Sequence, residues 1–171
     1  MTDAPPLSRP LAVSSVALEG LSVDVVADAA ERAALAAVNE TESIETFVAR
    51  LRVRPLGRDA VEVTGIVEAE ATRLCVVTLE PFVEVVREEV AVRFAPRAPG
   101  EPDGEADDAP DPLIGDTVDL GAVAAEFFTL GLDLHPRKPD AVFNSPTPPD
   151  DDDASPFAAL RAVARRGGDG E

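Results

Sequence analysis

Hydrophobic and polar residues alternate along the middle of the chain, from about residue 46 to residue 72. Outside the loop at 55–59, odd positions are apolar there, and most even positions carry arginine, glutamate or threonine. This period of two is typical of an antiparallel sheet with one face in solvent. The side chains expected on the buried face are Phe47, Ala49, Leu51, Val53, Val61, Val63, Gly65, Val67, Ala69 and Ala71. The segment 55–59, with its proline and glycine, predicts the loop between two strands.

The pattern changes after residue 73. Residues 74–79 are apolar apart from Thr78, which favours a more buried strand. Pro81 lacks an N–H group and should mark the corner before the next strand. In the segment 83–94 the apolar residues occupy first odd and then even positions. A β-bulge near residues 87–89, which adds one unpaired residue, would reconcile the two halves of that strand.

Two short strands and a helix are expected in the N-terminal region. The strands cover residues 11–18 and 21–26, with a tight turn between them. Asp28 and Glu31 have the spacing of a capping box, which predicts the start of an alanine-rich helix. The side chains of this helix expected to face inward are Leu35 and Val38.

A second helix is predicted over residues 119–131, with Asp119 as its N-cap. Val118 and Val123 have the spacing of a hydrophobic staple. The apolar stripe expected to cover the sheet consists of Leu120, Val123, Ala124, Phe127 and Leu130. The sequence therefore predicts an α+β fold, a twisted antiparallel sheet of about five or six strands covered by one main helix.

Proline, glycine and acidic residues divide the chain into segments. Such stretches bury too little apolar surface to offset the entropy of ordering them. The expected organisation is a flexible N-terminus (1–10), a single domain (11–143) with a mobile acidic loop (95–116), an acidic linker (144–154), a short helix (155–166) and a tail (167–171).

The short helix 155–166 is predicted from Ser155 as N-cap and a proline after it. A helix of this length is marginal alone in water, so it should form on docking. Its docking residues are expected to be Phe157, Leu160 and Val163, with Arg161 and Arg165 beside them. Either the protein's own sheet or the groove of a partner could receive this helix.

The net charge of −18 is concentrated in residues 99–153, which carry 15 acidic and 2 basic side chains. A chain this acidic repels phosphate backbones at long range, so any RNA contact must be local and sensitive to salt. Of the 15 basic residues only Lys138 is lysine. The arginine bias reflects either a GC-rich genome or the use of guanidinium groups to bind phosphate or carboxylate.

No apolar run approaches the ~20 residues of a membrane helix. The N-terminus also lacks the basic start and apolar stretch of a secretory signal. We therefore expect a cytoplasmic protein without a membrane partner.

Arg50, Arg52 and Arg54 share one face of a predicted strand, and Arg58 lies close by in the loop. These four residues are the best candidates for RNA contact. Aromatic residues that could stack on bases are absent from that face. The alternative is that the arginines pair across strands with the glutamates at 62, 68 and 70.

No cofactor, metal, catalytic residue or small-molecule substrate is expected. Cys75 is the sole cysteine and Thr78 stands where a Cys-x-x-Cys pair would place its second thiolate, which excludes a disulfide or a thiolate-rich zinc site within one chain. Cys75 is either a small core residue or, with Arg73 near it, a reactive thiol. His135 is the sole histidine and fits a surface loop. The acidic run 150–153 lacks the ligand spacing of a calcium loop and fits a solvated linker.

Three landmarks occur in order along the chain. The first comprises Cys75, Leu79, Glu80, Pro81 and Phe82; the second comprises Asp119, Leu120, Gly121 and Glu126, followed by Pro136, Arg137 and Pro139; the third begins at Ser155-Pro156-Phe157. Together they resemble the YceD-type family, the large ribosomal RNA subunit accumulation proteins. The resemblance implies a bacterial, non-enzymatic ribosome-biogenesis factor that supports accumulation or processing of 23S ribosomal RNA, with precursor RNA or ribosomal proteins as partners. The alternative is an acidic adaptor that engages basic ribosomal proteins without contacting RNA.

Overall fold

The structure is a computed structural model that describes residues 5–96, 109–113 and 115–143. The chain divides into two compact units, Met1–Ala141 and Val142–Glu171, and all helices and strands named below belong to the first. The predicted linker 144–154, the helix 155–166 with Phe157, Leu160, Arg161, Val163 and Arg165, and most of the predicted acidic loop lie outside the described residues.

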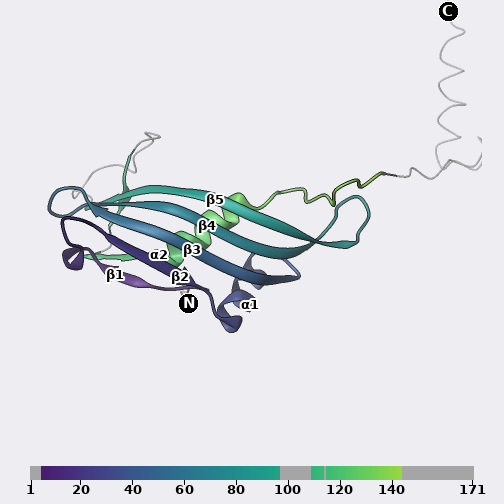
Figure 1. Ribbon diagram of the computed structural model, residues 1–171, viewed down its shortest axis with the longest axis horizontal. Coiled ribbons are helices and arrows are strands. Elements are labelled where there is room, and N and C mark those ends of the chain that lie inside the picture. Colours follow the sequence, from purple (N-terminus) through teal and green to yellow (C-terminus); the bar gives the residue numbers. More distant parts are fainter. Residues whose placement is uncertain (1–4, 97–108, 114, 144–171) are drawn as a thin grey trace, which may run out of the picture. The chain divides into compact units, whose positions relative to one another are not determined.

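A five-stranded sheet forms the centre of the described domain, in the order β2-β3-β4-β5-β6 (Figure 1). The first four strands pair antiparallel and the last pair is parallel. Its strands are β2 (Leu21–Val26), β3 (Ser43–Pro55), β4 (Val61–Leu74), β5 (Pro81–Ala95) and β6 (Asp111–Pro112). A second pairing joins β1 (Pro10–Ala12) to β7 (Thr117–Asp119). The helices are α1 (Ala29–Val38) and α2 (Leu120–Gly131), with a 3-10 turn at Val13–Ser15. The predicted α+β class and the mostly antiparallel sheet are confirmed.

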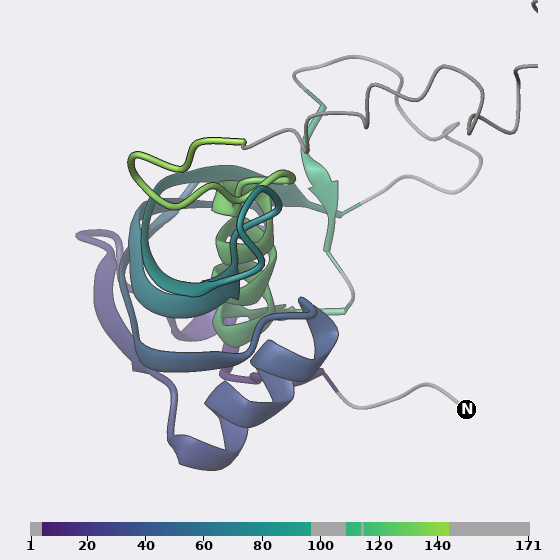
Figure 2. The same ribbon diagram turned by 90° about the vertical axis from the view of Figure 1, so that its right-hand side faces the viewer.

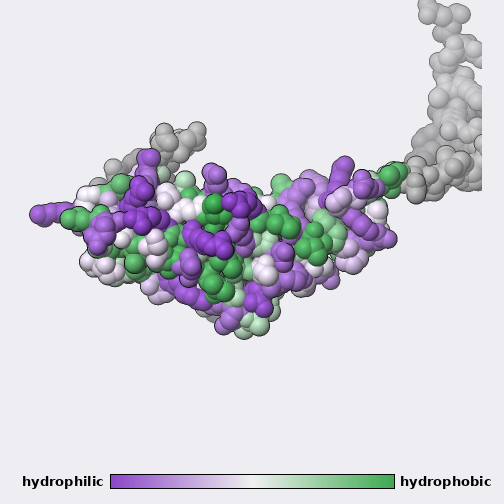
Figure 3. All heavy atoms as spheres, in the orientation of Figure 1, coloured by the Kyte–Doolittle hydropathy of each residue, from purple (hydrophilic) through white to green (hydrophobic). Residues whose placement is uncertain are grey.

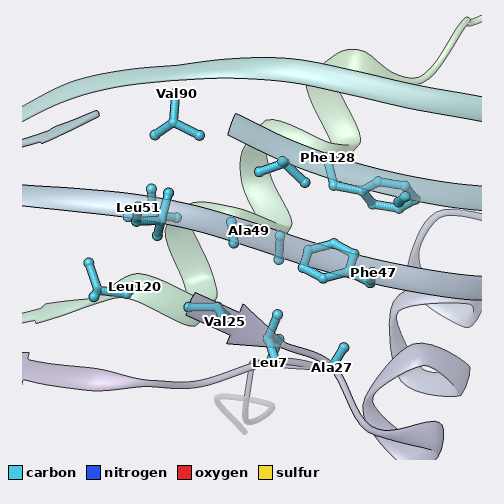
Figure 4. Packing of buried hydrophobic residues seen from close by; sticks show 14 of the residues in the cluster. Leu7, Val25, Ala27, Phe47, Ala49, Leu51, Val90, Leu120 and Phe128 are labelled. Carbon is cyan, nitrogen blue, oxygen red and sulfur yellow. The ribbon is translucent and has the colours of Figure 1, made fainter. Parts of the chain in front are cut away.

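The sheet curves around α2, which lies on its concave side (Figure 2). The predicted alternation is confirmed in β3 and β4, where odd-numbered side chains such as Phe47 and Val63 are buried. The core lies between this inner face and α2, and Figure 4 shows Phe128 of α2 next to Phe47. Their ring centroids are 5.5 Å apart in an edge-to-face arrangement, which is favourable for aromatic pairs.

The capping box of α1 is present as predicted. The Asp28 carboxylate accepts the backbone N–H groups of Ala30 and Glu31, and the Glu31 side chain accepts the N–H of Asp28. Leu35 is buried, but Val38 is 66% exposed, so the expectation that both face inward is wrong for Val38. Val38 is the last residue of the helix, where the chain leaves the core.

The apolar stripe predicted for α2 is confirmed for Leu120, Val123 and Ala124, but its C-terminal half was assigned wrongly. The buried side chains include Leu120, Ala124 and Phe128, whereas Phe127 is only partly buried and Leu130 is 68% exposed. A spacing of four residues keeps Leu120, Ala124 and Phe128 on one side of the helix, so Phe128 and not Phe127 fills the core.

Of the strand predicted at residues 74–79, only Leu74 is in a strand, as the last residue of β4, and residues 75–79 belong to the turn between β4 and β5. Its ends are tied by a hydrogen bond of 2.9 Å from the Cys75 N–H to the Glu80 carbonyl. Leu74, Val76 and Leu79 are 44%, 47% and 75% exposed, and only Cys75 is buried. The apolar run therefore forms the tip of a hairpin, and Pro81, predicted at the corner before the next strand, is the first residue of β5.

The predicted bulge near residues 87–89 is absent. The β4–β5 register is continuous from Val61 opposite Phe94 to Leu74 opposite Pro81. Even-numbered residues of β5 face inward throughout, and Val83 and Val85 are exposed on the outer face. The change of apolar parity thus reflects surface valines. The register shift of the sheet lies in β3, between Ile44 and Thr46.

The strand predicted over 11–18 is shorter and pairs elsewhere. Only Pro10–Ala12 is a strand, and it pairs with β7 rather than with β2. Residues expected to form a flexible N-terminus also belong to the domain, because Leu7 is 1% exposed and Pro10 starts β1. Part of the expected loop 95–116 likewise forms β6.

Candidate functional site

The predicted arginine row lies on the outer face of the sheet, opposite to the face that α2 covers. Arg50, Arg52 and Arg54 are exposed and alternate with buried residues of β3. Arg58 is exposed in the β3–β4 loop. The sequence pattern therefore placed these four side chains correctly at the surface.

The strand register brings two further arginines to the same face. Arg54 lies opposite Glu62, and Glu62 lies opposite Arg93 of β5. Arg87 of β5 lies opposite Glu68. Sequence reasoning named neither: the expected bulge obscured which way Arg87 faces, and Arg93 reaches this face only through the register of the β4–β5 hairpin. We define the arginine face as Arg50, Arg52, Arg54, Arg87 and Arg93.

Glu62 and Glu68 of β4 lie on the arginine face, each between an arginine of β3 and an arginine of β5. Arg50 and Arg87 both donate to the Glu68 carboxylate, and the Arg93 Nε lies 3.6 Å from Glu62. The guanidinium-bearing side chains remain 61%, 64% and 59% exposed, respectively. The cross-strand pairing considered for these arginines is thus present for Arg50. Exposed pairs of this kind contribute little to stability, about 0–1 kcal/mol.

The pairing leaves donors available. Arg52 donates to the Ser22 hydroxyl at 3.1 Å and to the Glu19 carbonyl, and neither contact neutralises its charge. Arg54 has no ion pair with any residue in the described part of the chain. A guanidinium carries five N–H donors in a fork that matches a phosphate group.

The outer face is nearly balanced in charge, unlike the chain as a whole. The acidic side chains that share it with the five arginines are Asp24, Glu45, Glu62, Glu68, Glu70 and Glu89. A phosphate would meet local bidentate donors there and not a long-range positive field, so binding must depend strongly on salt. Figure 3 shows hydrophilic and hydrophobic residues interspersed over the side of the molecule that it presents.

A second cluster forms where the β4–β5 turn meets the segment after α2. The Val76 N–H donates to the Pro136 carbonyl at 2.9 Å, and the Lys138 Nζ lies 2.9 Å from a Glu80 carboxylate oxygen. Leu79 adopts a φ of 58°, the left-handed turn conformation. Two landmarks far apart in the sequence are therefore brought together; we call this the turn cluster, made of Cys75, Val76, Leu79, Glu80, Pro136 and Lys138.

An ion pair beside the turn cluster fixes the segment after α2. Arg73 and Glu84 are 3.0 Å apart, and both are largely buried. Arg73 also donates to the Asp133 carbonyl at 2.7 Å, while Glu84 accepts the Asp133 N–H at 3.2 Å. Arg73 thus serves the packing of the chain, and it is Thr78 and Lys138 that lie beside Cys75.

Cys75 is fully buried, yet its thiol is acidified. The pKa of Cys75 is lowered from 9.0 to about 7, chiefly because the Thr78 hydroxyl hydrogen-bonds to the sulfur. Burial opposes this shift, and backbone hydrogen bonds from Lys138, Thr78 and Val77 support it. Turn geometry therefore stabilises a thiolate inside the cluster.

Asp119 and Gly121 join the N-terminal segment to α2. The Asp119 carboxylate accepts the Ser8 hydroxyl at 2.6 Å and the N–H groups of Arg9, Gly121 and Ala122 at 2.7, 2.9 and 3.1 Å. A Cβ atom at Gly121 would lie 2.8 Å from the backbone of Ser8 and Arg9, which leaves room for glycine alone. Asp119 is the predicted N-cap, and its second role could not be seen in the sequence.

The other motif positions divide between core and surface. Leu120 and Pro136 are buried, Phe82 is partly buried, and Pro81, Glu126, Arg137 and Pro139 are exposed. His135 is also exposed, and its backbone N–H donates to the Asp133 carboxylate at 2.9 Å. Among residues 5–96, 109–113 and 115–143, no three His, Cys, Asp or Glu side chains gather closely enough to hold a metal ion. The same residues contain no helix with the length and hydropathy to cross a membrane.

Residues 63–163 match the family model described as the large ribosomal RNA subunit accumulation protein YceD. This match covers more than half of the chain. The chain belongs to the YceD family. No curated protein and no solved structure matches it.

The YceD match contains the turn cluster, Asp119, Gly121 and Glu126, so the three landmarks seen in the sequence lie in the matched region. It also contains the β5 arginines, Arg87 and Arg93. Arg50, Arg52 and Arg54 precede it. The arginine face is therefore formed partly by residues within the family match and partly by the strand before it.

Proposed function

We propose that this YceD-family protein is a non-enzymatic ribosome-biogenesis factor of the bacterial cytoplasm that supports accumulation or processing of 23S ribosomal RNA. The family description carries this proposal, because it names accumulation of the large-subunit RNA and no chemical reaction. The arginine face supplies the RNA contact. It supports the proposal through its exposed guanidinium groups, which retain free donors beside Glu62 and Glu68.

The contact is made to phosphates and not to bases. Arginine forks bind phosphate oxygens in a bidentate manner, whereas base reading by single-strand binders needs stacking aromatics, and the outer-face residues of β2–β5 include no tryptophan, tyrosine or phenylalanine. Approach of a phosphate displaces Arg50 and Arg87 from Glu68, at little cost because exposed ion pairs are weak. The protein therefore follows the backbone of its RNA without strong sequence preference.

Changing Arg50, Arg52 and Arg54 together to glutamine tests this contact. The affinity for a large-subunit RNA fragment should fall, and the slope of log K against log salt should decrease by up to about three units, since each neutralised phosphate contributes nearly one. Filter binding over a salt series, with circular dichroism to show an intact fold, measures both.

The triple change to lysine is the matched control. It keeps three positive charges and removes the forks, so the salt slope should persist while affinity falls. If the glutamine variant retains the wild-type slope, the arginines do not contact RNA. In that case the adaptor function, in which the acidic chain engages basic ribosomal proteins, becomes the better account. The excess of 15 acids over 2 bases in residues 99–153 favours that second candidate.

A further inference from the structure

A groove of about 370 Å³ lies beside the N-terminal half of α2, where β1, β5, β6 and β7 meet it. Its walls are mainly apolar and come from segments far apart in the sequence: Pro10, Phe94, Pro112, Ala122 and Val123. Phe94 belongs to the inward-facing set of β5, so the groove opens on the side of the sheet opposite to the arginine face. Neither the family description nor the proposed RNA contact uses it.

Two carboxylates border the groove, and only one is available. Asp119 already accepts four hydrogen bonds, and its pKa is lowered: burial acts to raise it, but the bonds from Ser8, Arg9, Ala122 and Gly121 outweigh burial. Glu126 is exposed on α2 and has no ion pair within the described ranges. A ligand in the groove would therefore meet apolar walls and the negative charge of Glu126.

The apolar walls and the negative charge of Glu126 together favour a positively charged ligand with an apolar side chain. A nucleic acid would place phosphates beside Glu126, and a second copy of the chain would bring another net charge of −18. A basic segment of a protein is attracted by the same field and can place an apolar side chain between Phe94 and Val123. We propose that the groove binds a basic peptide segment of a partner protein, with an apolar residue in the groove and a neighbouring arginine or lysine on Glu126.

The proposal extends the function beyond RNA contact, because it assigns protein and RNA partners to opposite sides of one sheet. Charge-assisted hydrogen bonds to a carboxylate are among the stronger polar contacts in proteins. The apolar anchor supplies the remaining affinity through burial. A partner of this kind could occupy the groove while RNA lies on the arginine face.

Nuclear magnetic resonance titration of the isotope-labelled full chain tests the groove directly. The probes are three five-residue synthetic peptides: alternating arginine and leucine, alternating arginine and glycine, and alternating glutamate and leucine. The arginine–leucine peptide should shift the amide signals of Ala122, Val123 and Glu126, and the other two should bind at least about tenfold more weakly. Equal shifts with the glutamate–leucine peptide would overturn the charge argument.

Substitution of Glu126 separates the site from general attraction to an acidic protein. Glu126→Lys should weaken the arginine–leucine peptide about tenfold or more. Glu42→Lys is the control, because it makes the same change in net charge at a residue that does not line the groove. Glu42 lies just before β3 and beside α1, so this variant should leave binding nearly unchanged. Equal losses in both variants, or none in Glu126→Lys, would show that the peptide is held elsewhere.

A photo-crosslinker at the exposed position Thr117, which also lines the groove, identifies the occupant. Crosslinks to the added peptide that are lost in the Glu126→Lys variant support the proposal. Crosslinks confined to a second copy, or to another segment of the same chain, would assign the groove to that occupant and overturn it. Because RNA binding is measured separately on the arginine face, failure here leaves the proposed RNA contact standing.

Discussion

Single side chains in this protein carry roles that depend on distant partners. Cys75 is a small buried residue in an apolar run, which is how the sequence pattern described it. Its acidity arises from Thr78 and from backbone groups that include Lys138, a residue brought there by the packing of the segment after α2. Thr78 lies three positions from Cys75 in the sequence, so this contact could be expected from the sequence. The contact with Lys138 could not, because it forms only when the chain folds.

Replacing Thr78 by valine should raise the pKa of the Cys75 thiol from about 7 toward its ordinary range, because the hydroxyl makes the largest contribution to the shift. The chain has one cysteine and no tyrosine or tryptophan, so thiolate absorbance in the ultraviolet can be followed against pH in the folded protein without interference. An identical titration midpoint in the two proteins would show that Thr78 does not hold the thiolate.

The lowered pKa of the Cys75 thiol also makes the stability of the fold depend on pH. The folded pKa lies below the value of 9.0 for a free thiol, so the stabilisation is fully present above that value and is lost as the pH falls through about 7. The difference in unfolding free energy between wild type and Thr78→Val should therefore be larger at pH 9 than at pH 6. A difference that is constant with pH would contradict this assignment.

At the scale of elements, alternation located β3 and β4 and the caps located both helices. Asp28, Glu31 and Asp119 act through neighbours in the sequence, so local chemistry was sufficient to find them. The pairing of β1 with β7 joins residues more than a hundred positions apart, and no local pattern encodes it. Val83 and Val85 of β5 are apolar but lie on the exposed face. The sequence pattern therefore suggested that the strand changes face, and this led to the wrong prediction of a bulge.

The register of β5 can be tested with two neighbouring valines. Val86 is buried against the inner face and Val85 is 72% exposed. Val86→Ala should cost about 1–3 kcal/mol of unfolding free energy through lost burial and the remaining cavity. Val85→Ala should cost less than about 1 kcal/mol, the range of strand propensity. Chemical denaturation measures both, and the opposite ranking would restore a bulge.

At the scale of the whole molecule, the arginine face and the groove beside α2 lie on opposite sides of the sheet and differ in charge. The strand row Arg50, Arg52 and Arg54 was predictable from alternation, whereas Arg87 and Arg93 join it only through the register of the hairpin. The groove beside α2 could not be predicted, because Pro10, Phe94 and Pro112 meet there only after folding. The acidic excess, visible in the sequence, is the basis for the basic occupant proposed for the groove.

The most direct test of the central claim is the level of large-subunit ribosomal RNA in cells. In cells that lack this protein, mature 23S RNA should fall relative to small-subunit RNA, and the wild-type gene should restore the ratio. The variant with Arg50, Arg52 and Arg54 changed to glutamine should restore it only in part, and the lysine variant should restore it more fully. An unchanged ratio of the two RNAs in cells without the protein would contradict the proposed function.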